Sequence, residues 1–191
     1  MTKIIGLGHY SRTGKNTLAN MLEDELRYRG IQARQVSFAR RLKDVCYELY
    51  KWAGVLPGSY YETDEGAAER NTKIPALGMN VVELWIKVGN MFRDEIHPDT
   101  WLNSALATTS KHTLIVTDVR FENEAEAIRD RGGSLIKVVR KGVLPRDSVS
   151  DRELLYYEHW DLTVENDGTL EDLRQQAYTI ARRFAEKGTV A

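Results

Sequence analysis

Short apolar runs alternate along the chain with segments whose apolar residues recur every three or four positions. Lys3–Gly8 is an apolar run that ends in glycine, which is typical of a buried strand. A helical apolar stripe follows it and is terminated by Gly30; its members are Leu18, Met21, Leu22 and Leu26. This order predicts a strand, a loop and a helix at the start of the chain.

The same alternation continues along the rest of the chain. Val36–Ala39 is expected as a second strand, followed by a helical face formed by Leu42, Val45, Cys46 and Leu49. Further apolar runs predict strands at Thr113–Thr117, Leu135–Val139 and Leu162–Val164. Helices are predicted at Glu122–Arg131 and after the capping pair Thr169 and Asp172. The alternation predicts an α/β fold, a parallel sheet with helices on both faces, whose ligand site lies at the carboxyl ends of the strands.

The middle of the chain breaks this pattern. Residues 55–76 carry Pro57, Gly58, a tyrosine pair, several acidic residues and Pro75, so we expect an irregular or mobile insertion there. A helix then runs through Phe92, with an apolar face predicted to consist of Met79, Val82, Trp85, Ile86 and Gly89. A second short helix is expected at Asp99–Ala107, with Asp99 as its cap.

Length and composition narrow the class of protein. The chain has 191 residues, which at about 150 residues per domain suggests one domain with room for an insertion or a lid. It is 42% hydrophobic and 29% charged, with a formal net charge of −1. No apolar run approaches the roughly 20 residues of a membrane helix, and the one cysteine cannot form an intramolecular disulfide. We expect a cytoplasmic protein with no membrane and no nucleic acid as its main partner.

The segment Gly8–Thr17 carries the strongest chemical signal. It lies between the first strand and the first helix, where backbone N–H groups bind phosphates and a lysine, here Lys15, reaches their oxygens. His9 stands where the first glycine of such a loop is expected, and Asn16 replaces the Ser or Thr that binds Mg²⁺ in GTPases and many ATPases. The alternative is a surface turn that matches the motif by chance, but the strand–loop–helix context favours nucleotide binding.

Further candidates follow later strands and helices. Asp118 ends the most apolar strand and suits an Mg²⁺ ligand, although aspartates also end strands without function. Arg120 could bind a substrate phosphate in bidentate fashion or pair with a nearby carboxylate. Arg93 lies beside an apolar segment, and Arg70 is a further candidate for substrate binding. Trp101 could stack on a base or pack in the core.

Together these segments resemble the phage-type deoxynucleoside monophosphate kinases, a branch of the adenylate-kinase-like P-loop kinases. The resemblance spans residues 3–175 in order, and Thr117–Ala125 is its most specific block. The other matching segments are Tyr10–Thr17, Ser37–Ala39 with Leu42 and Lys43, Val88–Arg93, Pro98–Trp101 and Asn166–Leu170.

The resemblance implies a three-layer P-loop fold that transfers the γ-phosphate of ATP to a deoxynucleoside monophosphate. The catalytic residues would be Lys15, Arg93, Asp118 and Arg120. ATP would be bound by Ser11, Arg12, Thr13, Gly14, Lys15, Asn16, Thr17, Arg140, Asn166 and Gly168. The monophosphate would be bound by Lys43, Arg70, Arg93, Trp101 and Arg120, and Mg²⁺ by Asp118 and Thr17. Residues 55–76 would form the insertion on the monophosphate side and residues 140–152 the lid.

Three departures from the family pattern stand out: His9, Asn16 in place of the usual Asp, and a lid that reads Asp147-Ser148-Val149-Ser150-Asp151 instead of His-x-Ser-Glu. Two other functions stay open, a P-loop kinase acting on a hydroxyl of a metabolite or of DNA, and a non-catalytic nucleotide-binding protein. A hydroxyl acceptor needs a general base, whereas a phosphate acceptor is already ionised near neutral pH. Base preference and oligomeric state, a homodimer included, are open as well, and a phage-encoded chain would act in the host cytoplasm.

Overall fold

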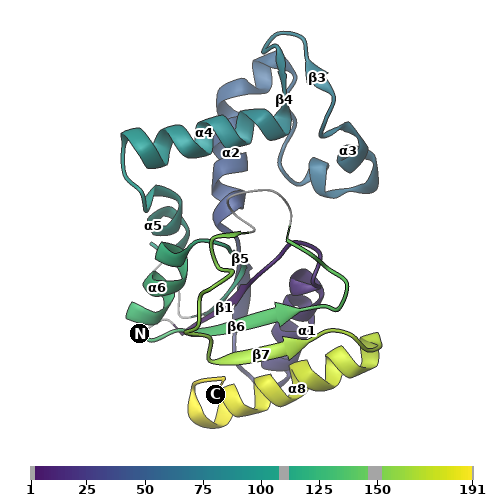
Figure 1. Ribbon diagram of the computed structural model, residues 1–191, viewed down its shortest axis with the longest axis vertical. Helices are drawn as coiled ribbons and strands as arrows, with labels where there is room; N and C mark the ends of the chain where they lie inside the picture. The colour runs from purple at the N-terminus through teal and green to yellow at the C-terminus, as the bar shows by residue number, and fades with distance from the viewer. Residues whose placement is uncertain (1–2, 108–111, 146–151, 191) are drawn as a thin grey trace. The chain divides into compact units, whose positions relative to one another are not determined.

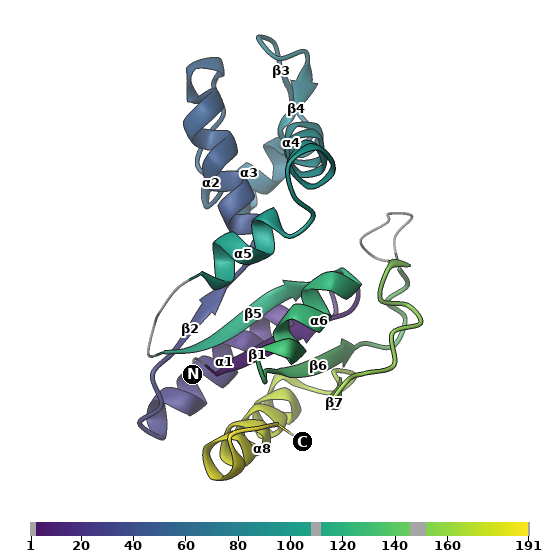
Figure 2. The same cartoon turned by 90° about the vertical axis from the view of Figure 1, so that its left-hand side faces the viewer.

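The computed structural model describes residues 3–107, 112–145 and 152–190. The chain forms two compact units (Figures 1 and 2). One consists of Met1–Ser37 with Thr108–Ala191 and is called the sheet unit; the other is Phe38–Ala107 and is called the helical unit. Each is described by itself. No helix in the described part of the chain is long and apolar enough to span a membrane.

The sheet unit is built on five parallel strands in the order β2-β5-β1-β6-β7. In chain order the strands are β1 (Ile4–Gly8), β2 (Ala33–Val36), β5 (Thr113–Val119), β6 (Ser134–Val139) and β7 (Leu162–Glu165). The central strand β1 pairs on one side with β5, where Ile5 faces Ile115, and on the other with β6. The predicted parallel sheet is therefore confirmed.

Helices cover both faces of this sheet. Helices α1 (Lys15–Tyr28) and α8 (Leu170–Lys187) pack side by side on one face, and α6 (Glu122–Asp130) lies on the other (Figure 2). Alternate residues of β1 point to opposite faces of the sheet. Ile5 and Leu7 belong to the core that α1 and α8 cover, whereas Gly6 lies against Ile128 of α6. The three layers expected for this fold are present.

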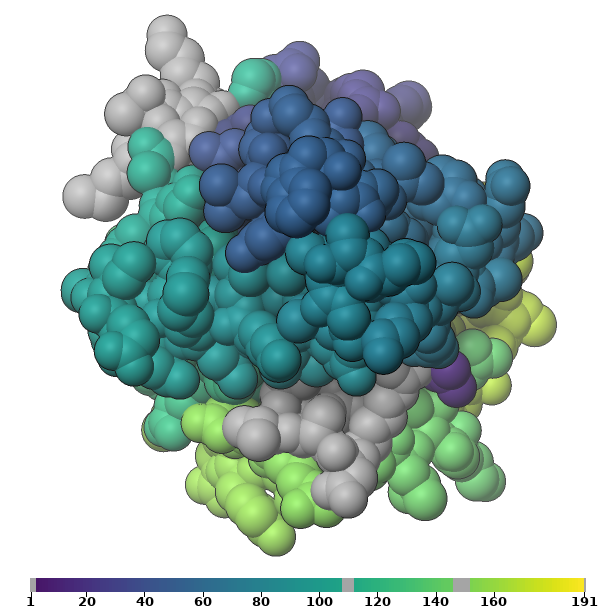
Figure 3. Space-filling view, turned by 90° about the horizontal axis from the view of Figure 1, so that it is seen from above, coloured from purple at the N-terminus to yellow at the C-terminus, as the bar shows by residue number. Residues whose placement is uncertain are grey.

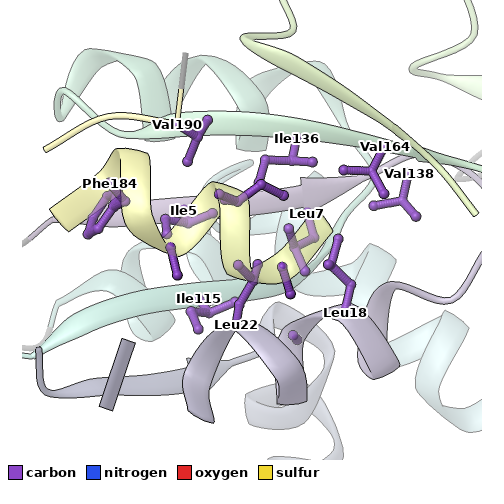
Figure 4. Packing of buried hydrophobic residues seen from close by; sticks show 14 of the residues in the cluster. Ile5, Leu7, Leu18, Leu22, Ile115, Ile136, Val138, Val164, Phe184 and Val190 are labelled. Atoms are coloured by element: carbon purple, nitrogen blue, oxygen red, sulfur yellow. The ribbon is translucent and has the colours of Figure 1, made fainter. Parts of the chain in front are cut away.

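A continuous apolar core joins the sheet to α1 and α8 (Figure 4). It includes Leu18 and Leu22 from α1 and Phe184 from α8, all at most 1% exposed. Burying each such side chain stabilises the fold by about 1.5–3 kcal/mol. The core fixes the position of β1 and α1, and thereby both ends of the loop between them.

The helical unit has α2 (Phe38–Tyr50) in contact with α4 (Val81–Glu95) and α5 (Thr100–Leu106). Figure 3 shows residues of α2 in blue against those of α4 in teal. Between α2 and α4 lie short elements: the 3-10 turns Lys51–Ala53 and Tyr60–Glu62, the helix α3 (Asp64–Glu69), and a hairpin of β3 (Lys73–Ile74) and β4 (Met79–Asn80). Buried side chains from α2, α4 and α5 form its interior: Phe38, Cys46, Val81, Leu84, Val88, Trp101 and Leu102.

The structure differs from the prediction at one boundary and in the character of one segment. The second strand lies at Ala33–Val36, paired with β5 from Thr113 to Val116, and Phe38 already begins α2. Phe38 is 2% exposed, so its burial within the helical unit outweighs its strand preference. The segment 55–76 is also not irregular, because it contains the turn, helix and strand given above, and Thr63 caps α3 by accepting a hydrogen bond from Gly66 N at 3.1 Å.

The start and the buried face of α4 also differ from the prediction. The helix starts at Val81 and not at Met79, because Asn80 and Glu83 form a reciprocal capping box at its N-terminus. Its buried face is Val81, Leu84, Val88 and Gly89, whereas Ile86, expected inside, is 56% exposed. The predicted short helix is confirmed as α5, with Asp99 at the N-cap position but without a capping bond from its side chain.

Candidate functional site

The loop between β1 and α1 has a backbone shaped for an anion. His9, Arg12 and Gly14 have positive φ angles of 90°, 66° and 96°, and left-handed residues in such loops turn successive N–H groups into a concavity. The loop ends at Gly14, which occupies the N-cap of α1 without any side-chain capping bond, and the first turn of α1 carries no acidic residue. Helix N-termini of this kind attract phosphate oxygens.

The unexpected His9 adopts the backbone conformation that favours glycine. Its φ angle of 90° explains why glycine is the usual residue at this position, since a side chain there is strained. His9 is 8% exposed and its ring stacks on that of Tyr10 with centroids 3.7 Å apart. This contact is one observed compensation for the strain.

Lys15 lies inside the loop. Its side chain donates to the carbonyl oxygens of His9, at 3.0 Å, and of Tyr10, and its Nζ is 3.4 Å from Thr13 Oγ1. The residue is only 6% exposed. A cation held by neutral carbonyl oxygens keeps its charge available to attract the oxygens of a bound phosphate.

Asn166 fastens the loop from the end of β7. Its Nδ2 donates to the carbonyl oxygen of Thr13 at 2.9 Å, and its backbone N donates to Val139 O at 2.8 Å. A Cβ on Gly14 would overlap the amide of Asn166, so both its φ angle and this neighbour require glycine. The resemblance assigns Asn166 to the adenine side, and the structure shows it bonded to the backbone of the phosphate loop.

Asp118 accepts a hydrogen bond from Ser37, a residue to which the sequence assigned no role. Ser37 Oγ donates to Asp118 Oδ2 at 2.8 Å, and β2 and β5 are neighbours in the sheet. Asp118 lies within β5, one residue before its end. No local signal in the sequence marks Ser37, because its link to Asp118 depends on the pairing of β2 with β5. Carboxylate and hydroxyl oxygens are suitable ligands for Mg²⁺.

Arg120 connects β5 to the phosphate loop. Its Nη1 and Nη2 both donate to Ser11 Oγ at 3.2 Å, while its backbone N donates to Glu124 Oε2 at 2.8 Å. A guanidinium next to this loop carries the charge and the planar donors that bind phosphate in bidentate fashion.

Four other predicted residues belong to the helical unit. Lys43 forms an ion pair with Glu62 at 3.0 Å and lies 5.0 Å from the ring centroid of Trp85. Arg70 donates from Nε to the carbonyl oxygen of Tyr61 at 2.7 Å. Arg93 is half-buried in the last turn of α4.

The structure favours the packing alternative for Trp101, the fourth of these residues. Trp101 is 4% exposed, its Nε1 donates to Gly89 O at 3.2 Å, and its ring lies against Phe92 with centroids 5.1 Å apart. A ring enclosed in this way has no open face on which a base could stack.

The remaining predicted positions lie around the loop or beyond the described ranges. In the first turn of α1, Asn16 is exposed and Thr17 is half-buried, while Arg140 and Gly168 are exposed. Of the predicted lid, residues 146–151 lie outside the described residues. Across residues 3–107, 112–145 and 152–190 there is no group of three or more His, Cys, Asp or Glu side chains placed to hold a metal ion. Mg²⁺ in kinases is commonly held by one or two carboxylates together with substrate phosphates.

A family model and two viral relatives point to the same protein family. The family model described as deoxynucleotide monophosphate kinase matches residues 76–177, just over half of the 191 residues. A protein of Acanthamoeba polyphaga mimivirus, assigned by name to the deoxynucleotide monophosphate kinases, is 26% identical over 196 residues, covering 91% of this chain and 93% of its own. The deoxynucleotide monophosphate kinase of Escherichia phage RB69 is 38% identical over 68 residues, which cover 36% of this chain and 28% of that enzyme.

The fold also recurs among solved structures. Cobyrinic acid a,c-diamide synthase from Mycobacterium smegmatis, solved with ADP and magnesium, aligns with a TM-score of 0.51 at 13% identity. The alignment covers 98% of this chain and 97% of that one. At this level of identity the likeness concerns the arrangement of the parallel sheet and its helices.

Proposed function

Because the chain belongs to the deoxynucleotide monophosphate kinase family, we propose that it transfers the γ-phosphate of ATP to a deoxynucleoside 5′-monophosphate, giving ADP and a deoxynucleoside diphosphate. One observation carries the proposal: the buried Lys15 and the guanidinium of Arg120 both reach the same loop, at Thr13 and Ser11 respectively. Two cations at one phosphate-binding loop suit a reaction in which a negatively charged phosphoryl group is transferred from one phosphate to another.

ATP binding is assigned to the loop and to the start of α1. The N–H groups of Ser11–Thr17 would surround the β- and γ-phosphates, and the Lys15 ammonium would contact their oxygens. Asn166 supports this role by holding the loop backbone at Thr13. Gly168, which follows β7, would lie toward the adenine, and Arg140, at the start of the predicted lid, would bind ATP.

The residues present fit a magnesium ion, because Asp118 and the half-buried Thr17 offer oxygen ligands beside the loop. When bound, Mg²⁺ neutralises charge on the phosphates of ATP. Ser37 donates to Asp118 and keeps that carboxylate oriented.

The acceptor needs no general base. A nucleoside monophosphate has a second phosphate pKa near 6, so its oxygen is largely ionised and nucleophilic at neutral pH. What the enzyme must supply is the alignment of two anions against their repulsion. We assign this task to Arg120 together with Arg93 and Lys43, and we assign substrate binding also to Arg70, which donates to Tyr61 O.

Exclusion of water is assigned to residues 140–152 acting as a lid, because an open site would hydrolyse ATP. The relatives of mimivirus and of a phage suggest a viral origin for this chain. A kinase that supplies deoxynucleotides for viral DNA synthesis would work in the cytoplasm of the host, with a small anionic substrate as its main partner.

The experiment that tests the function is an ADP-release assay with each of the four deoxynucleoside monophosphates. We expect ADP to be released only when at least one of them is present. Release with hydroxyl acceptors alone would support a small-molecule or DNA kinase instead, and ATP binding without any release would support a non-catalytic protein.

A further inference from the structure

Glu124 is a buried acidic residue in the first turn of α6. It is 5% exposed, and its Oε2 accepts hydrogen bonds from two successive backbone N–H groups, those of Arg120 at 2.8 Å and Phe121 at 3.1 Å. One oxygen thus accepts from two successive residues of the turn between β5 and α6. Buried carboxylates are costly to desolvate, so their retention at a backbone turn calls for an explanation.

The turn held by Glu124 is the one that carries Arg120 to the phosphate loop. The backbone N of Arg120 is fixed by Glu124, and its guanidinium donates to Ser11 Oγ from both Nη atoms. A planar guanidinium binds phosphate well only in a defined orientation. The backbone from which the side chain leaves therefore controls where its charge lies.

Buried apolar residues dock α6 on the sheet. Ala125 and Ile128 are both 0% exposed, and Ile128 packs on Gly6 of β1. These apolar contacts hold the helix in place, whereas Glu124 Oε2 accepts from the N–H groups of Arg120 and Phe121 in the turn. The position of α6 and the orientation of Arg120 therefore depend on different contacts.

We propose that Glu124 is a positioning residue for phosphoryl transfer, acting through the backbone of Arg120. The inference rests on the proposed function, since it assigns Arg120 to the transferred phosphate. It extends the proposed function, because the orientation of Arg120 is then controlled by a residue that does not touch the substrate.

The test compares Glu124→Gln with Glu124→Ala. Because a single oxygen accepts both bonds, the amide oxygen of glutamine can replace it, and we expect kcat within twofold of the unaltered enzyme. Alanine removes the acceptor and should lower kcat at least tenfold, with the KM for ATP changed less than threefold, because Lys15 and Asn166 hold the loop independently. The kcat of Glu124→Asp, which keeps the charge but moves the oxygen away from the turn, should lie between those of the other two variants. Glu124→Asp replaces Glu124→Ala in the test if the alanine variant does not fold.

Glu83→Ala is the matched control. Glu83 makes the same kind of bond at the start of α4, accepting from Asn80 N at 2.9 Å, but it is exposed and lies in the helical unit. We expect its kcat to be unchanged. A tenfold loss in Glu83→Ala would mean that the effect of Glu124→Ala is a general consequence of losing a helix cap, and would overturn the proposal.

Two further readouts separate this proposal from the proposed function. If Glu124 acts through Arg120, then adding Glu124→Ala to the Arg120→Ala variant should not lower its residual turnover further. An additive loss of turnover would overturn the proposal.

Amide hydrogen exchange is the second readout, and it requires no turnover. The N–H groups of Arg120 and Phe121 should exchange at least tenfold faster in Glu124→Ala than in Glu124→Gln. Equal exchange rates would overturn the positioning role, whereas a lack of turnover in the unaltered protein would overturn the proposed function alone.

Discussion

At the scale of single residues, Lys15 combines burial with a cationic role. Its ammonium is held by the carbonyl oxygens of His9 and Tyr10, and it is 6% exposed. Such a group stabilises charge on phosphates far more strongly than an exposed lysine, because little water screens it.

We predict that Lys15→Ala lowers kcat/KM for ATP at least a hundredfold, equivalent to about 2.7 kcal/mol of lost transition-state stabilisation. The protein should remain folded, because the apolar core under α1 does not involve this side chain. Steady-state kinetics and circular dichroism check both parts. Lys187→Ala, at the exposed end of α8, is the control that should keep full activity.

Cys46 provides a residue-scale test of the helical unit. Burial raises the pKa of its thiol from 9.0 to about 12, and only the thiolate reacts with disulfide reagents. At pH 8 we expect modification by a disulfide reagent at least a hundredfold slower in the native protein than in denaturant. Equal rates would show that the thiol is accessible and that α2 packs differently.

The same shift sets a pH dependence. Because the folded-state pKa of Cys46 lies above its unfolded value, the contribution to stability is fully present below pH 9 and is lost as the pH rises toward 12. Urea unfolding at pH 8 and pH 10.5 should show a fall in the free energy of unfolding that is smaller in Cys46→Ala.

At the scale of elements, the phosphate loop depends on glycine at one position for two reasons. Gly14→Ala should lower ATP affinity at least tenfold, because the φ angle of 96° strains alanine and its Cβ would overlap the Asn166 amide. Gly30→Ala is the matched control: its φ angle is 74°, but nothing lies within 4 Å of the added Cβ. It should reduce stability by about 1 kcal/mol and leave ATP affinity, measured by calorimetry, unchanged.

Helix α8 offers a matched pair for the packing of the core. Leu173 is 1% exposed and Leu170 is 68% exposed on the same helix. Leu173→Ala should lower the free energy of unfolding by about 2–5 kcal/mol, whereas Leu170→Ala should change it by less than about 0.5 kcal/mol. Urea denaturation measures both. Similar losses in the two variants would contradict the packing of α8 against α1 and the sheet.

The strands and helices of the sheet unit could be predicted from local patterns, because apolar runs and capping residues are short-range signals. The capping box of Thr169 and Asp172 at the start of α8 is one confirmed case. The bonds that organise the loop are different in kind. Ser37 and Asp118 are 81 positions apart, and Asn166 and Thr13 are 153 apart, so both contacts follow from the strand order β2-β5-β1-β6-β7 and not from any local pattern.

The helical unit was predicted less well for the same reason. Its elements are short, and which face of α4 is buried depends on contacts with α2 and on the hairpin that ends at Asn80. Ile86 satisfies a helical stripe but is 56% exposed, because the neighbouring helix meets the face of Leu84 and Val88 instead. Periodicity identifies a helix more reliably than it identifies which of two apolar faces finds a partner.

At the scale of the whole molecule, net charge is a poor guide to the ligand. The chain has 27 basic and 28 acidic residues, which suggests no anionic partner. Some of the charge is paired locally, as between Lys43 and Glu62 and between Arg27 and Glu23, whereas the Lys15 ammonium is held by carbonyl oxygens and keeps its charge. Local placement of cations, and not their total, supports a small anionic substrate.

Transfer of a phosphoryl group between two nucleotides can be tested by following the group itself. The purified protein is incubated with γ-32P-labelled ATP, Mg²⁺ and each deoxynucleoside monophosphate in turn, and the products are separated chromatographically. We predict that the label appears in the corresponding deoxynucleoside diphosphate for at least one of the four, and that Lys15→Ala abolishes it. Label found only in inorganic phosphate, or remaining in ATP with all four, would contradict this transfer.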